Sequence, residues 1–215
     1  MQAAAAWLEQ RIADADQLHE VLLRCPPLLA ADVGRLQRNA CFLAGELGWQ
    51  HGDGQLAAFV LRHPHPFALL DCEGAEVQVM LRFFSGVVGA PREDCLGKYG
   101  SYLIHSLDRI VARYVHVQER APWRLYDHGG SLSLSWIKNA PRDLAVDGVA
   151  TADEVKAFVH EWPRSVEGQR LLAELRSGKM EGLPRPLPYA EAVERQQAGT
   201  GPQLKGRRGE ARQAA

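Results

Sequence analysis

The sequence has no long apolar run and no excess of charge of either sign. Its apolar stretches stay well short of the roughly 18 consecutive residues that a membrane-spanning helix needs, so we expect no membrane segment. The 25 Lys and Arg residues nearly balance 26 Asp and Glu residues, for a net charge of −1. This balance predicts neither a nucleic-acid-binding protein nor a strongly acidic one, so charge indicates no class of partner.

Cysteine is also scarce, and no two cysteines form a C-x-x-C pair. The four lie far apart in the sequence, at Cys25, Cys41, Cys72 and Cys95. The first residues lack the basic region and the continuous apolar stretch of a secretory signal. Without export, we expect the cysteines to be buried free thiols and the protein to act in the cytoplasm.

The remaining composition is ordinary for a globular protein, with 46% apolar and 24% charged residues in a chain of 215. We expect an N-terminal helix over residues 1–30 and one domain over residues 31–180. Residues 181–215 are rich in Pro, Gly, Gln and Arg, which bury little apolar surface, so this segment predicts a flexible tail. No internal repeat is evident in the sequence.

Apolar residues at helical spacing predict five helices, over residues 3–24, 32–47, 92–114, 151–162 and 165–180. Two of these helices carry recognisable ends. Asp32 is the expected N-cap of the second helix, and Gly48 is its expected C-cap. Thr151 and Glu154 have the spacing of a capping box.

Three short apolar runs between these helices, at residues 56–62, 67–72 and 76–84, predict strands joined by tight turns. Val77, Val79 and Leu81 recur at every second position of the third run, as in a half-buried antiparallel strand. A second hairpin is expected over residues 123–137, around two glycines. The sequence therefore predicts an α+β fold, with helices packed on an antiparallel sheet of about five strands (a three-stranded meander plus a hairpin).

His63, His65 and Asp71 are the best candidates for a metal or acid–base cluster. They would make the protein a small metal-assisted hydrolase or nuclease. However, the prolines at positions 64 and 66 predict a turn, and no further residue supplies a fixed ligand. Ser101 and His105 lie one helical turn apart, but a catalytic serine normally lies on an exposed turn or at a helix start. An enzyme is therefore not the favoured interpretation, and we expect no metal and no cofactor.

A second alternative is a regulatory protein of a mobile element that binds nucleic acid through basic residues near its end. Four such residues have only Glu210 opposing them: Lys205, Arg207, Arg208 and Arg212. A basic segment without interleaved aromatic residues or a recognisable reading helix is a weak signal. Nucleic acid is therefore not the expected partner.

The order of predicted elements over residues 32–175 resembles that of the type III secretion chaperones of the Tir chaperone kind. Glu46-Leu47-Gly48 closes the first helix as at that family's helix-to-strand junction. Residues 83–91 look like the family's third strand leading through a glycine–proline loop into its central helix. Residues 131–137, followed by Pro141 and Leu144, resemble its last strand and proline turn.

This resemblance implies a non-enzymatic homodimer that holds a segment of a client protein. The client would add to the edge of the sheet and contact Val77, Val79 and Leu81, a mode in which main-chain hydrogen bonds supply affinity. The central helix would form the dimer interface through four apolar side chains: Tyr99, Leu103, Leu107 and Ile110. The leading hypothesis from sequence is therefore a secretion-chaperone-like binding protein of the cytoplasm.

Overall fold

The computed structural model describes residues 2–49, 54–145 and 150–198, and within these ranges the fold is built from helices. One isolated antiparallel bridge, between Tyr126 and Leu132, is the β-structure present in this part of the chain. The predicted α+β fold with a five-stranded sheet is therefore wrong. None of the described helices is long and apolar enough to cross a membrane.

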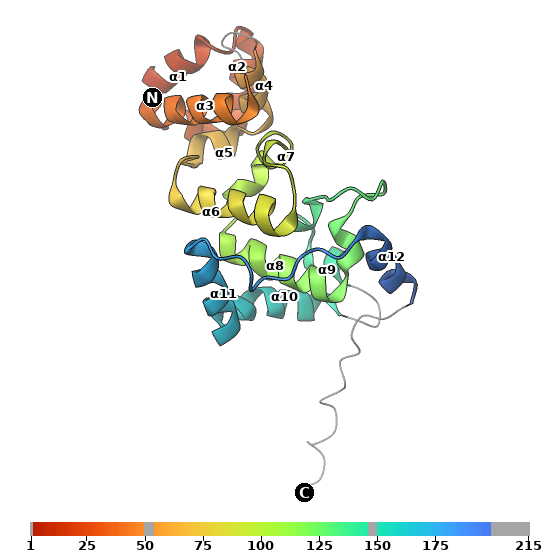
Figure 1. The fold of residues 1–215 in the computed structure, drawn as a ribbon. Coiled ribbons are helices and arrows are strands. Elements are labelled where there is room, and N and C mark those ends of the chain that lie inside the picture. The colour runs from red at the N-terminus through yellow and green to blue at the C-terminus, as the bar shows by residue number, and fades with distance from the viewer. Residues whose placement is uncertain (1, 50–53, 146–149, 199–215) are drawn as a thin grey trace, which may run out of the picture.

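Most of the helices up to α8 follow one another with short connections, whereas a longer segment precedes α12 (Figure 1). In chain order they are α1 (Gln2–Glu9), α2 (Ala15–Arg24), η1 (Pro26–Leu28), α3 (Val33–Leu47), α4 (Gln55–Arg62), α5 (Pro64–Leu69), α6 (Ala75–Phe83), η2 (Phe84–Val88), α7 (Arg92–Gly97), η3 (Gly100–Ile104), α8 (Leu107–Arg120), η4 (Pro122–Leu125), η5 (Ser135–Ile137), α9 (Pro141–Leu144), α10 (Ala152–Glu161), η6 (Trp162–Arg164), α11 (Val166–Arg176) and α12 (Tyr189–Gln197).

Residues 15–120 form three successive units of the same design. Each unit has a first helix, a short middle helix and a longer last helix: α2–η1–α3, then α4–α5–α6, then α7–η3–α8. The first helices begin at Ala15, Gln55 and Arg92, 40 and 37 residues apart. Helical repeats have periods of this size, so the order and spacing of these helices are those of a repeat, which the sequence did not reveal.

The three units stack in a line, from α1 at one end to the α8–α12 region at the other (Figure 1). The middle helices η1, α5 and η3 contact one another in order, which forms a ladder along the stack. Each unit contacts its neighbours, as in a solenoid whose stability is a sum of unit and interface terms. We call η1, α5, η3 and the following η5 the middle-helix ladder.

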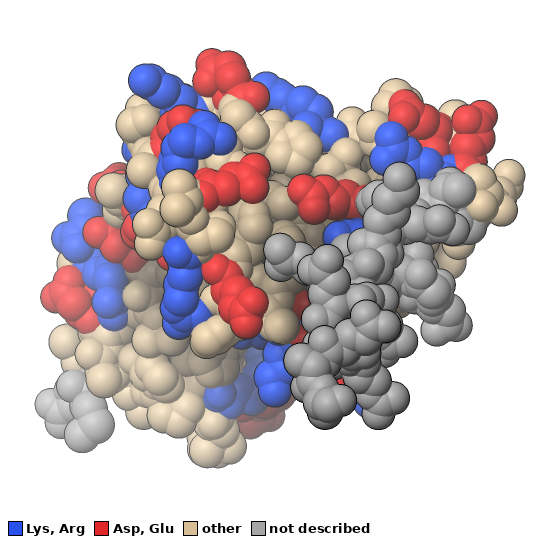
Figure 2. Space-filling model, turned by 90° about the horizontal axis from the view of Figure 1, so that it is seen from below, with Lys and Arg blue, Asp and Glu red and all other residues tan. Residues whose placement is uncertain are grey.

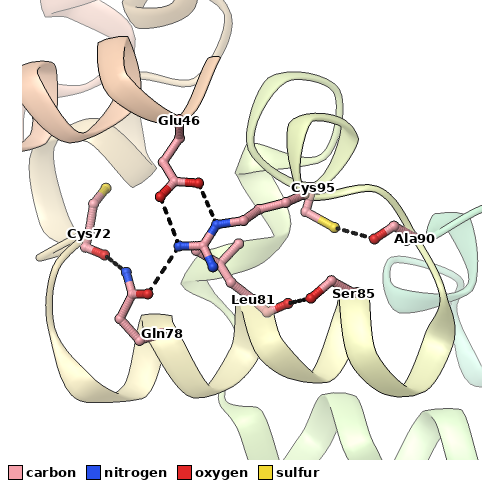
Figure 3. Close-up of polar contacts among 8 residues, drawn as sticks. Glu46, Cys72, Gln78, Leu81, Ser85, Ala90 and Cys95 are labelled. Carbon is pink, nitrogen blue, oxygen red and sulfur yellow. Dashed lines mark hydrogen bonds and ion pairs between the residues drawn. The ribbon is translucent and has the colours of Figure 1, made fainter. Parts of the chain in front are cut away.

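Polar side chains cross from one unit to the next. Arg92, at the start of α7, pairs with Glu46 of α3, with 3.1 Å between Nη2 and Oε1. The same Nη2 donates to Gln78 of α6 at 3.1 Å, and Gln78 donates to the carbonyl of Cys72 at 2.7 Å (Figure 3). This network joins all three units.

The region after α8 closes the stack. α8 packs against α10 and α11, and α12 packs against η4. Before α12, an extended segment crosses α8 and is held by side chains that donate to its carbonyls. Tyr114 Oη donates to Pro184 and Gln118 Nε2 donates to Arg185, both at 2.7 Å. We call residues 183–188 the strap; they belong to the segment that the sequence predicts as a flexible tail.

The three runs predicted as strands are α4, α5 and α6. A short apolar run is compatible with either a buried strand or a buried helix, so period alone does not separate the two. Pro64 is the first residue of α5, where a missing N–H costs nothing, and it starts a helix rather than a turn. In α6, Val77, Val79 and Leu81 are buried together with their neighbours Met80 and Phe83, so the two-residue period marked no exposed face.

Other boundaries changed too. The predicted hairpin over residues 123–137 consists of η4, the single bridge and η5. The predicted helix over residues 92–114 is divided into α7, η3 and α8, and the predicted helix over residues 3–24 is divided at Asp14. Asp14 caps α2 by accepting from the backbone N–H groups of Asp16 and Gln17.

The helices with recognisable caps are confirmed. The Asp32 carboxylate accepts from the N–H of Arg35 at 2.7 Å, and Gly48 ends α3 in the left-handed region at φ 66°. Thr151 and Glu154 form the expected capping box at the start of α10. The helix ends that depend on local hydrogen bonds were therefore predicted correctly from the sequence, whereas the tertiary packing was not.

Candidate functional site

A pocket of about 460 Å³ lies between the first half of α8 and α10, with α9 and η6 at its margins. Four cationic side chains line it: Arg109 and Arg113 from α8, Lys156 from α10 and Arg164 from η6. His160 and the hydroxyl-bearing Ser106 complete its polar lining. The residues are spaced by four along each helix, which places them on one face toward the pocket.

Asp108 is the acidic residue among the residues that line this pocket. Its carboxylate accepts from Arg176 Nη2 at 2.6 Å, and Arg176 also contacts Glu76 at 3.2 Å. Arg176 is thus shared by two carboxylates and offsets part of the charge of Asp108 from outside the pocket. The pocket keeps an excess of positive charge.

Arg113 is the most enclosed of the four cations, with 4% of its surface exposed. Its Nη1 donates to the carbonyls of Ile137 and of Asn139, the latter at 2.8 Å. Its Nε has no hydrogen-bond partner in the described part of the chain. Burial, and after it the charge of Arg109, lowers the pKa of Arg113. These hydrogen bonds fix the guanidinium in place at the wall of the pocket.

Arg113 occupies the seventh position of α8, and Asn39 occupies the seventh position of α3. Asn39 Nδ2 donates to the carbonyls of Phe67 at 3.0 Å and Leu70 at 2.8 Å. Both residues therefore hold the end of the next middle helix in the ladder, α5 for Asn39 and η5 for Arg113. Arg113 therefore attaches a middle helix, as Asn39 does in the first unit, and also lines the pocket.

The start of α8 adds to the positive potential of the pocket. Ser106 is the N-cap residue, but its side chain makes no capping hydrogen bond. The first N–H groups of a helix have no partners within the helix and carry partial positive charge. Ser106, Asp108 and Arg109, at the start of this helix of 14 residues, all line the pocket, so these groups lie close to it.

Further cations extend from the pocket along the middle-helix ladder. The ammonium of Lys138 lies 4.7 Å from the ring centre of Tyr102, and that of Lys98 lies 5.0 Å from the ring centre of Tyr99. The two rings contact each other, with centroids 5.3 Å apart. We call these two lysines and the four pocket cations the cationic belt.

The positive charge of this belt also affects the pKa of His105. Burial lowers it first, and the charges of Arg109, Arg113 and Lys138 lower it further. At the far end of the belt, the carboxylates of Asp94 and Asp127 lie near Lys98. On the face that Figure 2 shows, Lys and Arg lie beside Asp and Glu, so the charge on that face is mixed.

The three residues predicted to form a metal or acid–base cluster, His63, His65 and Asp71, lie in different environments in the structure. His63 is buried at the end of α4, where its Nε2 lies 3.0 Å from the carbonyl of Gly97, and burial lowers its pKa. His65 and Asp71 are exposed. Among the described residues, no group of three or more His, Cys, Asp or Glu side chains is placed to hold a metal. The basic residues between 205 and 212 lie outside the described residues.

The residues predicted to contact a client, Val77, Val79 and Leu81, are all less than 7% exposed. The residues predicted for a dimer interface belong to the same core: Tyr99, Leu103, Leu107 and Ile110. In this structure, both sets pack inside the chain and present little surface to a partner. The sequence reasoning did not single out the four pocket cations, although their four-residue spacing was visible.

No protein-family model, no curated protein and no solved structure matches this sequence.

Proposed function

We propose that this protein is a non-enzymatic binding protein, built from helical repeats, that binds the phosphate backbone of a nucleic acid on its cationic belt. The observation that carries the proposal is the convergence of four cations on one pocket whose single lining carboxylate, Asp108, is paired elsewhere. Arginine matches phosphate because its planar fork can donate two parallel hydrogen bonds. Three of the four pocket cations are arginines.

A polymer fits better than a small isolated anion because the cations continue beyond the pocket. Lys138 and Lys98 extend the belt along the middle-helix ladder, past η5 and η3. Stacked repeats create extended surfaces that suit extended partners. Contacts to phosphates position a protein on nucleic acid without reading its sequence. The proposal therefore concerns affinity for the backbone, and leaves base recognition aside.

The proposal departs from the leading hypothesis from sequence. A client strand cannot add to a sheet edge in a fold whose described part has no strand, so that mode of binding is withdrawn. A protein partner is retained as a second candidate because of one observation. Leu69 and Ile104 end successive middle helices and are 51% and 45% exposed. An apolar segment of a partner would cover them.

The test is the affinity of the protein for a labelled oligonucleotide, measured by fluorescence anisotropy at low salt. The double variant Arg109→Ala with Lys156→Ala removes two exposed cations of the belt. We expect it to bind about tenfold more weakly than the natural protein, a loss of about 1.4 kcal/mol. The matched control, Arg38→Ala with Lys179→Ala, removes one exposed Arg and one exposed Lys outside the belt.

The control should keep most of the affinity. Equal losses in both double variants would mean that only overall charge matters. Absence of binding by the natural protein would contradict the proposed function. Capture of a polypeptide that the double variant Leu69→Ser with Ile104→Ser no longer binds would favour the second candidate.

A further inference from the structure

The pocket at the start of α8 differs from the rest of the belt in the density of its charge. It gathers Arg109, Arg113, Lys156 and Arg164 around a single cavity, whereas Lys98 and Lys138 lie singly over tyrosine rings. An internal phosphodiester carries one negative charge. A terminal phosphate carries about −1.5 to −2 near neutral pH and has three acceptor oxygens.

We infer that the pocket receives the terminal phosphate of a nucleic-acid strand, while the remainder of the belt contacts internal phosphodiesters. This inference rests on the proposed function, because it names the part of the nucleic acid that the same site selects. It is carried by the match between the excess charge of the pocket and a compact dianion.

The size of the pocket agrees with a discrete group. Its volume of about 460 Å³ lies within the range of about 300–1,000 Å³ of pockets that enclose small ligands. Pro141 of α9 and Pro163 of η6 stand at its margins and are both partly buried. The terminal phosphate of a strand, together with its last nucleotide, is a discrete group that can enter a space of this size.

The most enclosed donor of the pocket is already in position. Arg113 is held by the carbonyls of Ile137 and Asn139, so its guanidinium needs no reorganisation on binding. The first N–H groups of α8 and the free hydroxyl of Ser106 supply further donors. Fixed donors favour a ligand with many acceptor atoms at one point, because their ordering cost is already met.

The test compares oligonucleotides of one sequence that differ only in their ends. One carries a 5′-phosphate, one a 3′-phosphate, and one has hydroxyl groups at both ends. We expect at least one phosphorylated form to bind about tenfold more tightly than the unphosphorylated form, as one strong charge-assisted contact would provide. The two phosphorylated forms show which end enters the pocket.

A variant locates the effect. Lys156→Ala with Arg164→Ala should reduce the ratio between phosphorylated and unphosphorylated forms toward one, because both side chains line the pocket. The control Arg38→Ala with Lys179→Ala should keep the ratio. Inorganic phosphate at millimolar concentration should compete with the phosphorylated end more strongly than with the unphosphorylated strand.

The outcomes separate this inference from the proposed function. Equal binding of all three oligonucleotides by the natural protein would overturn the inference and leave backbone binding in place. Failure of all three to bind would overturn both. Tight binding of a phosphorylated peptide in place of any oligonucleotide would also overturn the inference and would assign the pocket to a phosphoprotein.

Discussion

At the scale of single residues, the seventh positions of α3 and α8 each hold a side chain that anchors the end of a middle helix. Asn39 is fully buried and makes three hydrogen bonds, two as donor to carbonyls of α5 and one as acceptor from the N–H of Cys72. Arg113 performs the same task for η5 and contributes to the pocket as well. One position therefore serves stability in one repeat and both stability and the site in another.

Replacement of Asn39 by alanine should destabilise the protein strongly. It removes three hydrogen bonds and leaves buried backbone groups unpaired, which costs about 1–3 kcal/mol for each group left without a partner. We expect a loss of about 3 kcal/mol, measured by urea denaturation. Arg38→Ala, at the exposed neighbouring position, should change stability by less than about 0.5 kcal/mol. Similar losses in the two variants would contradict this account of Asn39.

His116 should make stability depend on pH. Burial lowers its pKa from 6.5 to about 4, and the charge of Arg120 adds to the effect. The folded state therefore binds fewer protons at this site than the unfolded state. The contribution is complete above pH 6.5 and is lost as the pH falls from 6.5 toward 4, by at most about 3 kcal/mol.

The comparison with His116→Phe isolates this contribution from that of other groups. His116 already packs beside Phe158, with ring centroids 5.2 Å apart, so an aromatic replacement suits the space. Urea denaturation at neutral and at acid pH should show a smaller loss in the variant. An equal loss in both proteins would assign the acid sensitivity to other residues.

At the scale of elements, the strap shows how a segment of low apolar content is nevertheless fixed. Tyr114, Gln118 and Tyr126 donate to its carbonyls, and Leu183 anchors its start with 5% exposure. The extended segment makes no helical hydrogen bonds of its own, and three side-chain donors supply hydrogen bonds to its carbonyls instead. The composition of the segment did not reveal these partners, because they lie elsewhere in the sequence. Tyr114 and Gln118 belong to α8, and Tyr126 directly follows η4.

Leu183→Ala should loosen the strap. A buried leucine reduced to alanine costs about 2–5 kcal/mol, and a site near the surface falls at the low end of this range. We expect a loss of about 2 kcal/mol in urea denaturation and faster proteolysis within residues 183–188. The control is Val166→Ala, because Val166 is 87% exposed and should have little effect. Unchanged proteolysis in Leu183→Ala would show that the strap is held by its hydrogen bonds alone.

The elements that the sequence predicted correctly are those with local signals. Asp32, Gly48 and Thr151 mark helix ends through contacts with residues three or four positions away, and all three are confirmed. The elements predicted wrongly, α4 to α6, are short. In α6 the three consecutive residues Val79, Met80 and Leu81 are all buried, which blurs the contrast between faces on which a period depends.

At the scale of the whole molecule, the repeat was hidden because equivalent positions carry unlike residues. The seventh positions of α3, α6 and α8 hold Asn39, Leu81 and Arg113. An amide, a leucine and a guanidinium share no sequence signal, although two of them do the same work. The similarity lies in helix order and spacing, which become visible once the three units are stacked. The cationic belt lies at one end of the stack, since its residues belong to α8, α10 and η6 or directly follow α7 and η5.

The central claim is that the cationic belt binds the phosphates of a nucleic acid, and the dependence of affinity on salt tests it most directly. Each phosphate contact adds about −0.9 to the slope of log K against log salt for a duplex, measured between about 50 mM and 200 mM salt. We expect a negative slope for the natural protein, less steep by about 2 in Arg109→Ala with Lys156→Ala. An identical slope in that variant, beside an unchanged slope in Arg38→Ala with Lys179→Ala, would contradict the claim.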